Sequence, residues 1–246
     1  MSKKKSLTNY YSQGFTLANK SSEIYLISLA LSLLGILNSH SPKLPISGVM
    51  SLLGYLLVLI SWSFSLSIPV FLLQKQHKKF LDFHSIFSIT IQNTKRILLP
   101  AILLFALLVL LIIVSVVVFI IFINPTKEQF SQFLPNLSSL ISPSHPVFLV
   151  TPVISSFFIF TPFIFALENK GLFASIKDSF AISFRHLPYL ATVILIGMVT
   201  YSITSFLPIT ELWGLCLRIA ISLYVALIVK TSTLFYYQKS INSKES

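Results

Sequence analysis

Five long stretches without a charged side chain constrain this chain more than any other feature of its sequence. They run over residues 24–42, 44–74, 97–126, 129–167 and 186–210. A helix needs about 20 consecutive apolar residues to cross a bilayer, and backbone polar groups in lipid must be satisfied within the protein. Because 54% of all residues are hydrophobic and 10% are charged, one soluble core is too small to bury them. The sequence therefore predicts a membrane protein.

The predicted fold class is all-α, a polytopic transmembrane helix bundle with six spans. We place these spans at residues 24–38, 48–73, 98–123, 147–167, 187–208 and 212–236. The chain is expected to form a single membrane domain, 1–246. Its parts are a cytoplasmic amphipathic N-terminal segment (1–22), the six-span bundle (23–236) and a short cytoplasmic tail (237–246).

The distribution of lysine and arginine predicts the orientation of the bundle. Fourteen of the 18 basic residues fall in segments on one side, and short cytoplasmic segments retain Lys and Arg. The other side has Lys43 and Lys127. Both termini are therefore predicted to be cytoplasmic, with the protein in the cell (inner) membrane. The net charge of +11 is then an orientation signal and not a sign of nucleic-acid binding.

The first span has a second interpretation, a cleaved signal peptide, because a basic segment precedes its apolar run. The residues after that run, 38–42, contain no Ala-x-Ala cleavage site. An uncleaved anchor is the simpler interpretation.

A weak internal repeat divides the spans into three like-oriented hairpins. An amphipathic stretch that closes on a basic residue precedes the first, third and fifth spans, at 6–20, 80–96 and 172–185. These stretches are expected to be cytoplasmic, interfacial helices. Prolines recur at matching places, namely Pro69, Pro100, Pro162 and Pro188, although a chain with 12 prolines also shows such matches by chance. Repeats of one direction do not favour an inverted-repeat transporter.

The outer connection 124–146 is predicted to form one or two short helices on the membrane surface. The alternative is a lid over a central cavity.

A search for catalytic chemistry is negative. The seven acidic residues form no pair on one face of a span, and the five histidines lack metal-ligand spacing. No phosphate-binding loop or hydrolase motif is present, and Cys216 is the only cysteine. The sequence therefore predicts no enzyme, no metal and no cofactor.

Charges near or within the spans are the remaining candidate site residues: Arg218, Glu211, Lys230 and Glu168. A charge at a span centre costs about 2.5–3.5 kcal/mol. Arg218 either snorkels outward toward headgroups or Glu211, seven residues earlier, or faces the bundle interior and receives an anionic group such as a lipid phosphate. Lys230 is expected to snorkel to the cytoplasmic interface, and Glu168 to form a local pair with Lys170.

Hydroxyl side chains mark the second and fifth spans, and we expect most of them to bond to their own helix backbone. The alternative is a polar cavity between those two spans. The third span has one polar residue, Ser115, and is expected to face lipid.

The segments 161–171, 175–180 and 185–188 together resemble a broad group of poorly characterised prokaryotic proteins. These are similar to the six-helix membrane domain fused to some glycerophosphodiester phosphodiesterases. The shared pattern is a span ending near a proline, an acidic-Gly turn, a Ser-bearing amphipathic helix, a basic residue and another span. The resemblance implies architecture only, since this chain has no phosphodiesterase domain.

The leading hypothesis is thus a non-enzymatic, multi-pass protein whose basic amphipathic helices engage anionic lipid headgroups or a membrane protein partner. The alternative is a permease or channel-like subunit for a small or lipid-like solute.

Overall fold

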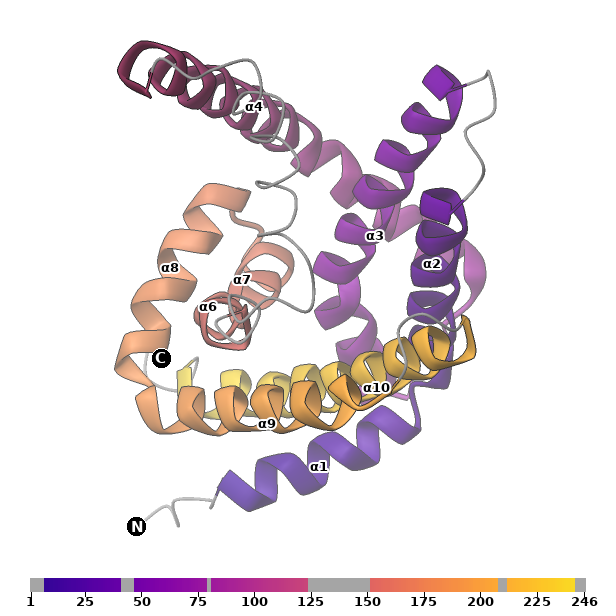
Figure 1. Cartoon of the computed structure of the whole chain (residues 1–246). Coiled ribbons are helices and arrows are strands. Elements are labelled where there is room, and N and C mark those ends of the chain that lie inside the picture. Colours follow the sequence, from indigo (N-terminus) through magenta and orange to yellow (C-terminus); the bar gives the residue numbers. More distant parts are fainter. Residues whose placement is uncertain (1–6, 41–46, 79–80, 124–150, 208–211, 242–246) are drawn as a thin grey trace.

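The computed structural model describes residues 7–40, 47–78, 81–123, 151–207 and 212–241, and these segments are helical (Figure 1). The predicted surface helices or lid at 124–146 lie outside the described residues. The helices are α1 Leu7–Asn19, α2 Ser22–His40, α3 Ser47–Gln76, α4 Phe83–Ile123, α6 Thr151–Phe157, α7 Thr161–Leu167, α8 Leu172–Arg185, α9 Leu187–Ser205 and α10 Leu212–Tyr236, which continues as a π-helix, η2, over Tyr237–Ile241.

Three helices in the described part of the chain are long and apolar enough to cross a membrane. These segments are Leu56–Gln76 of α3, Leu187–Ser205 of α9 and Trp213–Lys239 of α10 and η2. They match the predicted second, fifth and sixth spans, and the last helix extends past the predicted boundary at 236. Shorter apolar helices cover Ser22–Gly35 and Val153–Leu167. The six-span arrangement in hairpins stays a prediction.

The second repeat of helix and span is continuous where the sequence suggested a boundary. The expected amphipathic stretch 80–96 and the expected span 98–123 join in one helix, α4, of 41 residues. Pro100 lies inside it, where the proline lacks the N–H that would bond to the carbonyl of Arg96. The described apolar side chains beyond Pro100, such as Leu107 and Val114, are exposed in this chain, as expected for a helix that faces lipid.

The expected fourth span is broken into α6 and α7. The N–H of Thr161 bonds to the carbonyl of Phe158 at 3.0 Å and not to that of Phe157, so the α-helical pattern stops there. Pro162 then begins α7 in the first turn, where a missing N–H costs little. The carbonyl of Phe157 instead accepts the hydroxyls of Ser179 and Ser183 from α8, both at 3.0 Å.

The N-terminal helix α1 lies antiparallel along the second half of α10. The stretch that the sequence predicts as an interfacial helix therefore also packs closely against another helix of the protein. Gly14 faces α10 so closely that a Cβ there would lie 2.1 Å from Ser232 Oγ and 2.8 Å from Ser232 Cα. Thr231 donates a hydrogen bond of 2.8 Å to the carbonyl of Gly14. Tyr224 closes the far end of this contact by donating to Asn19 Oδ1 at 2.6 Å.

An aromatic cluster joins α1, α9 and α10. The rings of Tyr189 and Tyr236 stack with centroids 4.1 Å apart, and the ring of Tyr11 stacks with that of Tyr189 at 6.2 Å. Tyr10 packs edge-on against Tyr236 at 5.4 Å. The buried hydroxyl of Tyr189 is hydrogen-bonded to Thr233 Oγ1 at 2.7 Å. Such aromatic pairs add about 0.5–1.5 kcal/mol each beyond their burial.

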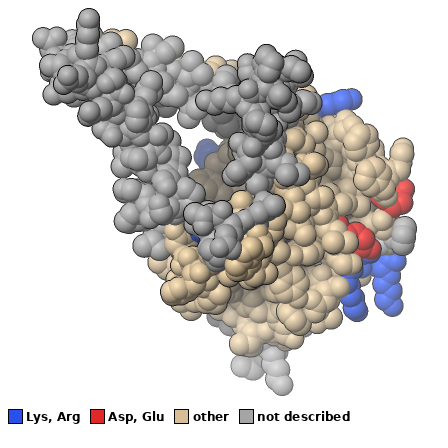
Figure 2. Space-filling model, turned by 45° about the vertical axis from the view of Figure 1, so that its right-hand side comes forward, with Lys and Arg blue, Asp and Glu red and all other residues tan. Residues whose placement is uncertain are grey.

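Helix α8 has its polar face inward. Ser175, Ser179 and Ser183 are fully buried against α6 and α7, while Phe173, Phe180 and Phe184 are 45–51% exposed. The start of α4 repeats this arrangement, with Thr90 and Asn93 buried and Phe83, Phe87 and Ile91 exposed. The two helices therefore present aromatic surfaces outward. In the face shown in Figure 2, the charged side chains lie mainly toward one edge and the rest of the described surface carries few of them.

Candidate functional site

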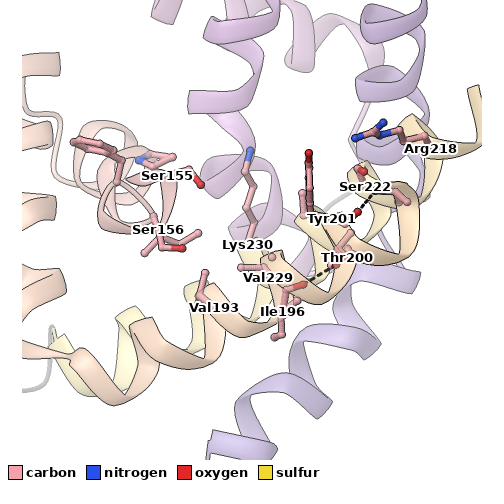
Figure 3. A pocket seen from close by; sticks show the side chains of 17 residues that line it. Ser155, Ser156, Val193, Ile196, Thr200, Tyr201, Arg218, Ser222, Val229 and Lys230 are labelled. Atoms are coloured by element: carbon pink, nitrogen blue, oxygen red, sulfur yellow. Dashed lines mark hydrogen bonds between the residues drawn. The ribbon is translucent and has the colours of Figure 1, made fainter. Parts of the chain in front are cut away.

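A pocket of about 450 Å³ lies between α6, α9 and α10 and contains two of the predicted site residues, Arg218 and Lys230 (Figure 3). Helical spacing explains its walls, because lining residues recur three or four apart along both long helices. Its polar groups are the two cations and the hydroxyls of Ser155, Ser156, Thr200, Tyr201, Thr204 and Ser222. Its apolar groups include Val193, Ile196, Val225 and Val229.

The ammonium of Lys230 points across the pocket and does not extend to the helix end. Its Nζ donates a hydrogen bond of 2.8 Å to Ser65 Oγ, which joins α10 to α3. The sequence favoured a lysine that snorkels to the cytoplasmic interface, and the structure shows a different arrangement. Ser65 stands four residues before Pro69, and the lysine stem reaches α3 at that level.

Arg218 lies toward the other end of the pocket (Figure 3). Its guanidinium carbon is 5.7 Å from the ring centroid of Tyr201, a cation–π contact between α10 and α9. Glu211, its predicted partner, lies outside the described residues, so that ion pair stays a prediction.

A second cavity of about 480 Å³ borders the break between α6 and α7. It shares Ser155, Phe158 and Pro162 with the first pocket, and Ser65 lines it as well. The hydrogen bond between Lys230 and Ser65 therefore lies where the two cavities approach each other. Thr161, which also lines the second cavity, has a buried Oγ1 with no hydrogen-bond partner among the described residues.

Most hydroxyls in the second and fifth spans bond to their own helix, as predicted. Examples are Ser63 to the carbonyl of Leu59 and Thr200 to that of Ile196, both at 2.8 Å. The alternative of a polar cavity between those spans is correct only in part. The cavity with hydroxyl lining uses the fifth span but pairs it with α6 and α10. The second span is connected to it through the hydrogen bond between Ser65 and Lys230.

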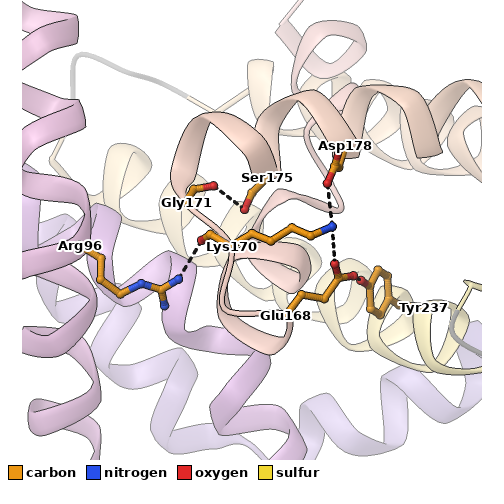
Figure 4. A network of polar contacts seen from close by, with 7 residues as sticks. All are labelled: Arg96, Glu168, Lys170, Gly171, Ser175, Asp178 and Tyr237. Atoms are coloured by element: carbon orange, nitrogen blue, oxygen red, sulfur yellow. Dashed lines mark hydrogen bonds and ion pairs between the residues drawn. The ribbon is translucent and has the colours of Figure 1, made fainter.

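Glu168 belongs to a polar network at the end of α7 (Figure 4). Lys170 Nζ lies 2.8 Å from Glu168 Oε2 and 2.8 Å from Asp178 Oδ2. These contacts, first of all the one with Asp178, raise the pKa of Lys170 well above its ordinary value. Tyr237 of η2 donates a hydrogen bond to Glu168 as well. The pair expected from the sequence is thus one part of a contact among α7, α8 and η2.

Arg96 completes this network from α4. Its guanidinium donates to the carbonyls of Phe165, at 2.9 Å, and Lys170, at 2.8 Å, and lies 3.9 Å from the Phe165 ring centroid. Asn169 adopts a left-handed backbone conformation, with φ 55°, just after α7 ends. A cation at this position satisfies carbonyls that the end of the helix leaves open.

No group of three or more His, Cys, Asp or Glu side chains suited to a metal occurs in the segments that the structure describes. The absence of enzymatic activity stays a prediction.

Comparison of the chain with protein-family models, with curated proteins and with solved structures gives no match. The resemblance described above accordingly stays a prediction, and the site must be interpreted from its own geometry.

Proposed function

We propose that this chain is a multi-pass integral membrane protein that binds anionic lipid at the cytoplasmic face of a cell membrane and has no catalytic site. The observation that carries this proposal is the outward aromatic face of α8. A helix that buries serines and exposes three phenylalanines suits an environment where apolar groups are not in contact with water.

Lys177 adds charge to this face of α8. It follows Phe173 by four residues and precedes Phe184 by seven, so helical spacing places it in the same stripe, and it is exposed. Aromatic rings prefer the level of the lipid headgroups, and a lysine stem lets its ammonium reach their phosphates. Each basic residue near an anionic membrane surface contributes about 1 kcal/mol.

The proposed orientation rests on the distribution of basic residues along the sequence. The basic residues of 75–79, 95–96 and 170–185 would share one membrane face with both termini, and the six spans would form three like-oriented hairpins. The prokaryotic family resemblance supports the same architecture.

Fluorescence quenching by brominated lipids tests the proposal. In a chain whose Trp62 and Trp213 are replaced by Phe, Phe180→Trp is expected to be quenched more strongly when bromine is carried by phosphatidylglycerol than by phosphatidylcholine. Lys177→Met should remove this difference. The matched control is Ala174→Trp, an exposed position outside the stripe. Equal quenching by both lipids would exclude anionic lipid selectivity at α8.

The pocket between α6, α9 and α10 favours a second candidate, a permease or channel-like subunit. Broken helices beside a polar cavity are common in transporters. Single cysteines at Thr200, Ser222 and Ser65, in a chain with Cys216 replaced by Ala, would react with water-soluble maleimides along a transport path. Uniformly inert positions would remove this candidate.

A further inference from the structure

The pocket between α6, α9 and α10 carries positive charge that the described structure does not balance. Four acidic residues are described. Glu23 pairs with Lys75, whereas Glu168 and Asp178 both pair with Lys170. Asp82 is exposed at the start of α4. None of the four lines the pocket that contains Lys230 and Arg218.

Lys230 is the residue at which this unbalanced charge is most destabilising. Its ammonium donates a hydrogen bond to a neutral hydroxyl, Ser65 Oγ. An ammonium removed from water without an opposite charge is destabilising by several kcal/mol, and an anion beside it offsets that cost. Ser155 and Ser156 of α6 line the same pocket. A serine hydroxyl can donate a hydrogen bond to an anionic oxygen.

The shape of the pocket limits the kind of anion. Lys230 and Arg218 are 12 residues apart on α10, roughly 18 Å along the helix axis. Between them the walls are apolar, with Val225 and Val229 on α10 and Val193 and Ile196 on α9. A small inorganic anion would fill only one end and would leave this apolar surface without a partner.

We propose that the pocket binds one anionic amphiphile, with its negatively charged headgroup at Lys230 and its acyl chain along the groove between α9 and α10 toward Arg218. The headgroup chemistry is a carboxylate or a phosphodiester. This site is internal and separate from the lipid contact proposed for α8.

Thermal unfolding of delipidated protein in mild detergent tests the site, with oleate and phosphatidylglycerol as the two anionic probes and monoolein as the uncharged probe. The unfolding temperature of the wild type is expected to rise with at least one anionic probe and not with monoolein. A rise with oleate alone identifies a carboxylate, and a rise with phosphatidylglycerol identifies a phosphodiester. No rise with either, or an equal rise with monoolein, would overturn the proposal.

Variants assign the two ends of the ligand. Lys230→Met should weaken the apparent affinity on the order of tenfold or more. Its unfolding temperature without lipid should rise, because an ammonium in a membrane-length helix with no acidic residue in its pocket is gone. Lys230→Arg should retain binding. Ala226 also lines the pocket, and Ala226→Phe should abolish binding by filling the groove while the cation remains. Lys20→Met, at an exposed lysine, is the matched control. Retained affinity in both Lys230→Met and Ala226→Phe, or loss only in Arg218→Met, would contradict the assignment.

Discussion

Arg96 is one of the basic residues that predict the orientation, and its side chain also holds two distant helices together. The guanidinium donates to carbonyls at and beyond the end of α7, 69 and 74 residues away in sequence. A hydrogen bond that involves a charged group is worth about 1.5–3 kcal/mol. Arg96 thus stabilises the polar network around Glu168, in addition to its place among the basic residues that predict the cytoplasmic side.

Arg96→Met should therefore lower the free energy of unfolding by about 2–4 kcal/mol, because both carbonyls lose their donor. Arg96→Lys should recover only part of this, since an ammonium lacks the planar fork. Unfolding in denaturing detergent, followed by tryptophan fluorescence, measures the change. Lys95→Met, at the exposed neighbour, is the control. Equal effects at 95 and 96 would show that only charge matters.

The ion pair between Glu23 and Lys75 should make the stability of the protein depend on pH. Lys75 Nζ lies 2.6 Å from Glu23 Oε1, and this hydrogen bond lowers the pKa of Glu23 below its ordinary value. Because this pKa is lowered in the folded protein, the ionised Glu23 stabilises the fold at neutral pH. That stabilisation is lost as the pH falls through the pKa of Glu23 in the folded state. The unfolding temperature of the wild type should exceed that of Glu23→Gln at pH 7, and the two should converge toward pH 3. A constant difference would contradict the ion pair.

The sequence identifies Lys230 and Arg218 as candidates because each interrupts an apolar run, but it does not identify what they contact. Lys230 and Ser65 are 165 residues apart. Their meeting depends on how α3 and α10 pack, which periodicity does not encode. Sequence reasoning also missed Ser155 and Ser156, whose only signal is their place shortly before Pro162.

At the scale of elements, periodicity correctly predicts an amphipathic helix, α8, before the membrane-length helix α9, but not which face of it packs inward. Burial normally selects the apolar face, and α1 follows this rule with Tyr10 and Leu17 buried. Helix α8 does the reverse, because the break after Phe157 leaves a carbonyl that only a polar face can satisfy. The inward serines therefore follow from a break in another helix.

Ser179→Ala combined with Ser183→Ala should cost more than the two single changes added together. Either hydroxyl alone still satisfies the carbonyl of Phe157, whereas the double change leaves it unpaired at about 1–3 kcal/mol. Detergent unfolding of the single and double variants measures this coupling. Ser205→Ala, an exposed hydroxyl that bonds to its own helix at Ser202, is the control. Additive effects would argue against shared satisfaction of this carbonyl.

Gly14→Val should separate α1 from α10. A Cβ at this position would lie 2.7 Å from the backbone nitrogen of Ser232, so α10 cannot yield by a side-chain rotation alone. Overpacking of this kind costs about 1–3 kcal/mol, and limited proteolysis should cut within α1 sooner. Gly35→Val is the matched control, since a Cβ there meets nothing within 4 Å. Equal protease resistance of the wild type and Gly14→Val would contradict the close contact.

For the whole molecule, the uncharged stretches coincide with two of the three membrane-length helices, in α3 and α9, whereas the third, in α10, contains Arg218 and Lys230. The breaks and junctions depend on tertiary contacts. Sidedness is directly measurable. In a chain with Cys216 replaced by Ala, Ser131→Cys should react with an impermeant maleimide on intact cells. Ser6→Cys and Ser243→Cys should react only after lysis, because both termini are predicted to be cytoplasmic. Labelling of either terminus on intact cells would reverse the orientation.

The contact of Gly14 with Thr231 and Ser232 also sets an order for biogenesis. Helix α1 leaves the ribosome well before α10, the helix on which it packs, because 217 residues of chain separate Gly14 from Thr231. During synthesis, the apolar face of α1 has no docking surface until α10 is inserted. Final closure of the fold is therefore a late, post-insertion event, and a nascent chain that stops before α10 would keep α1 undocked and open to quality-control proteases.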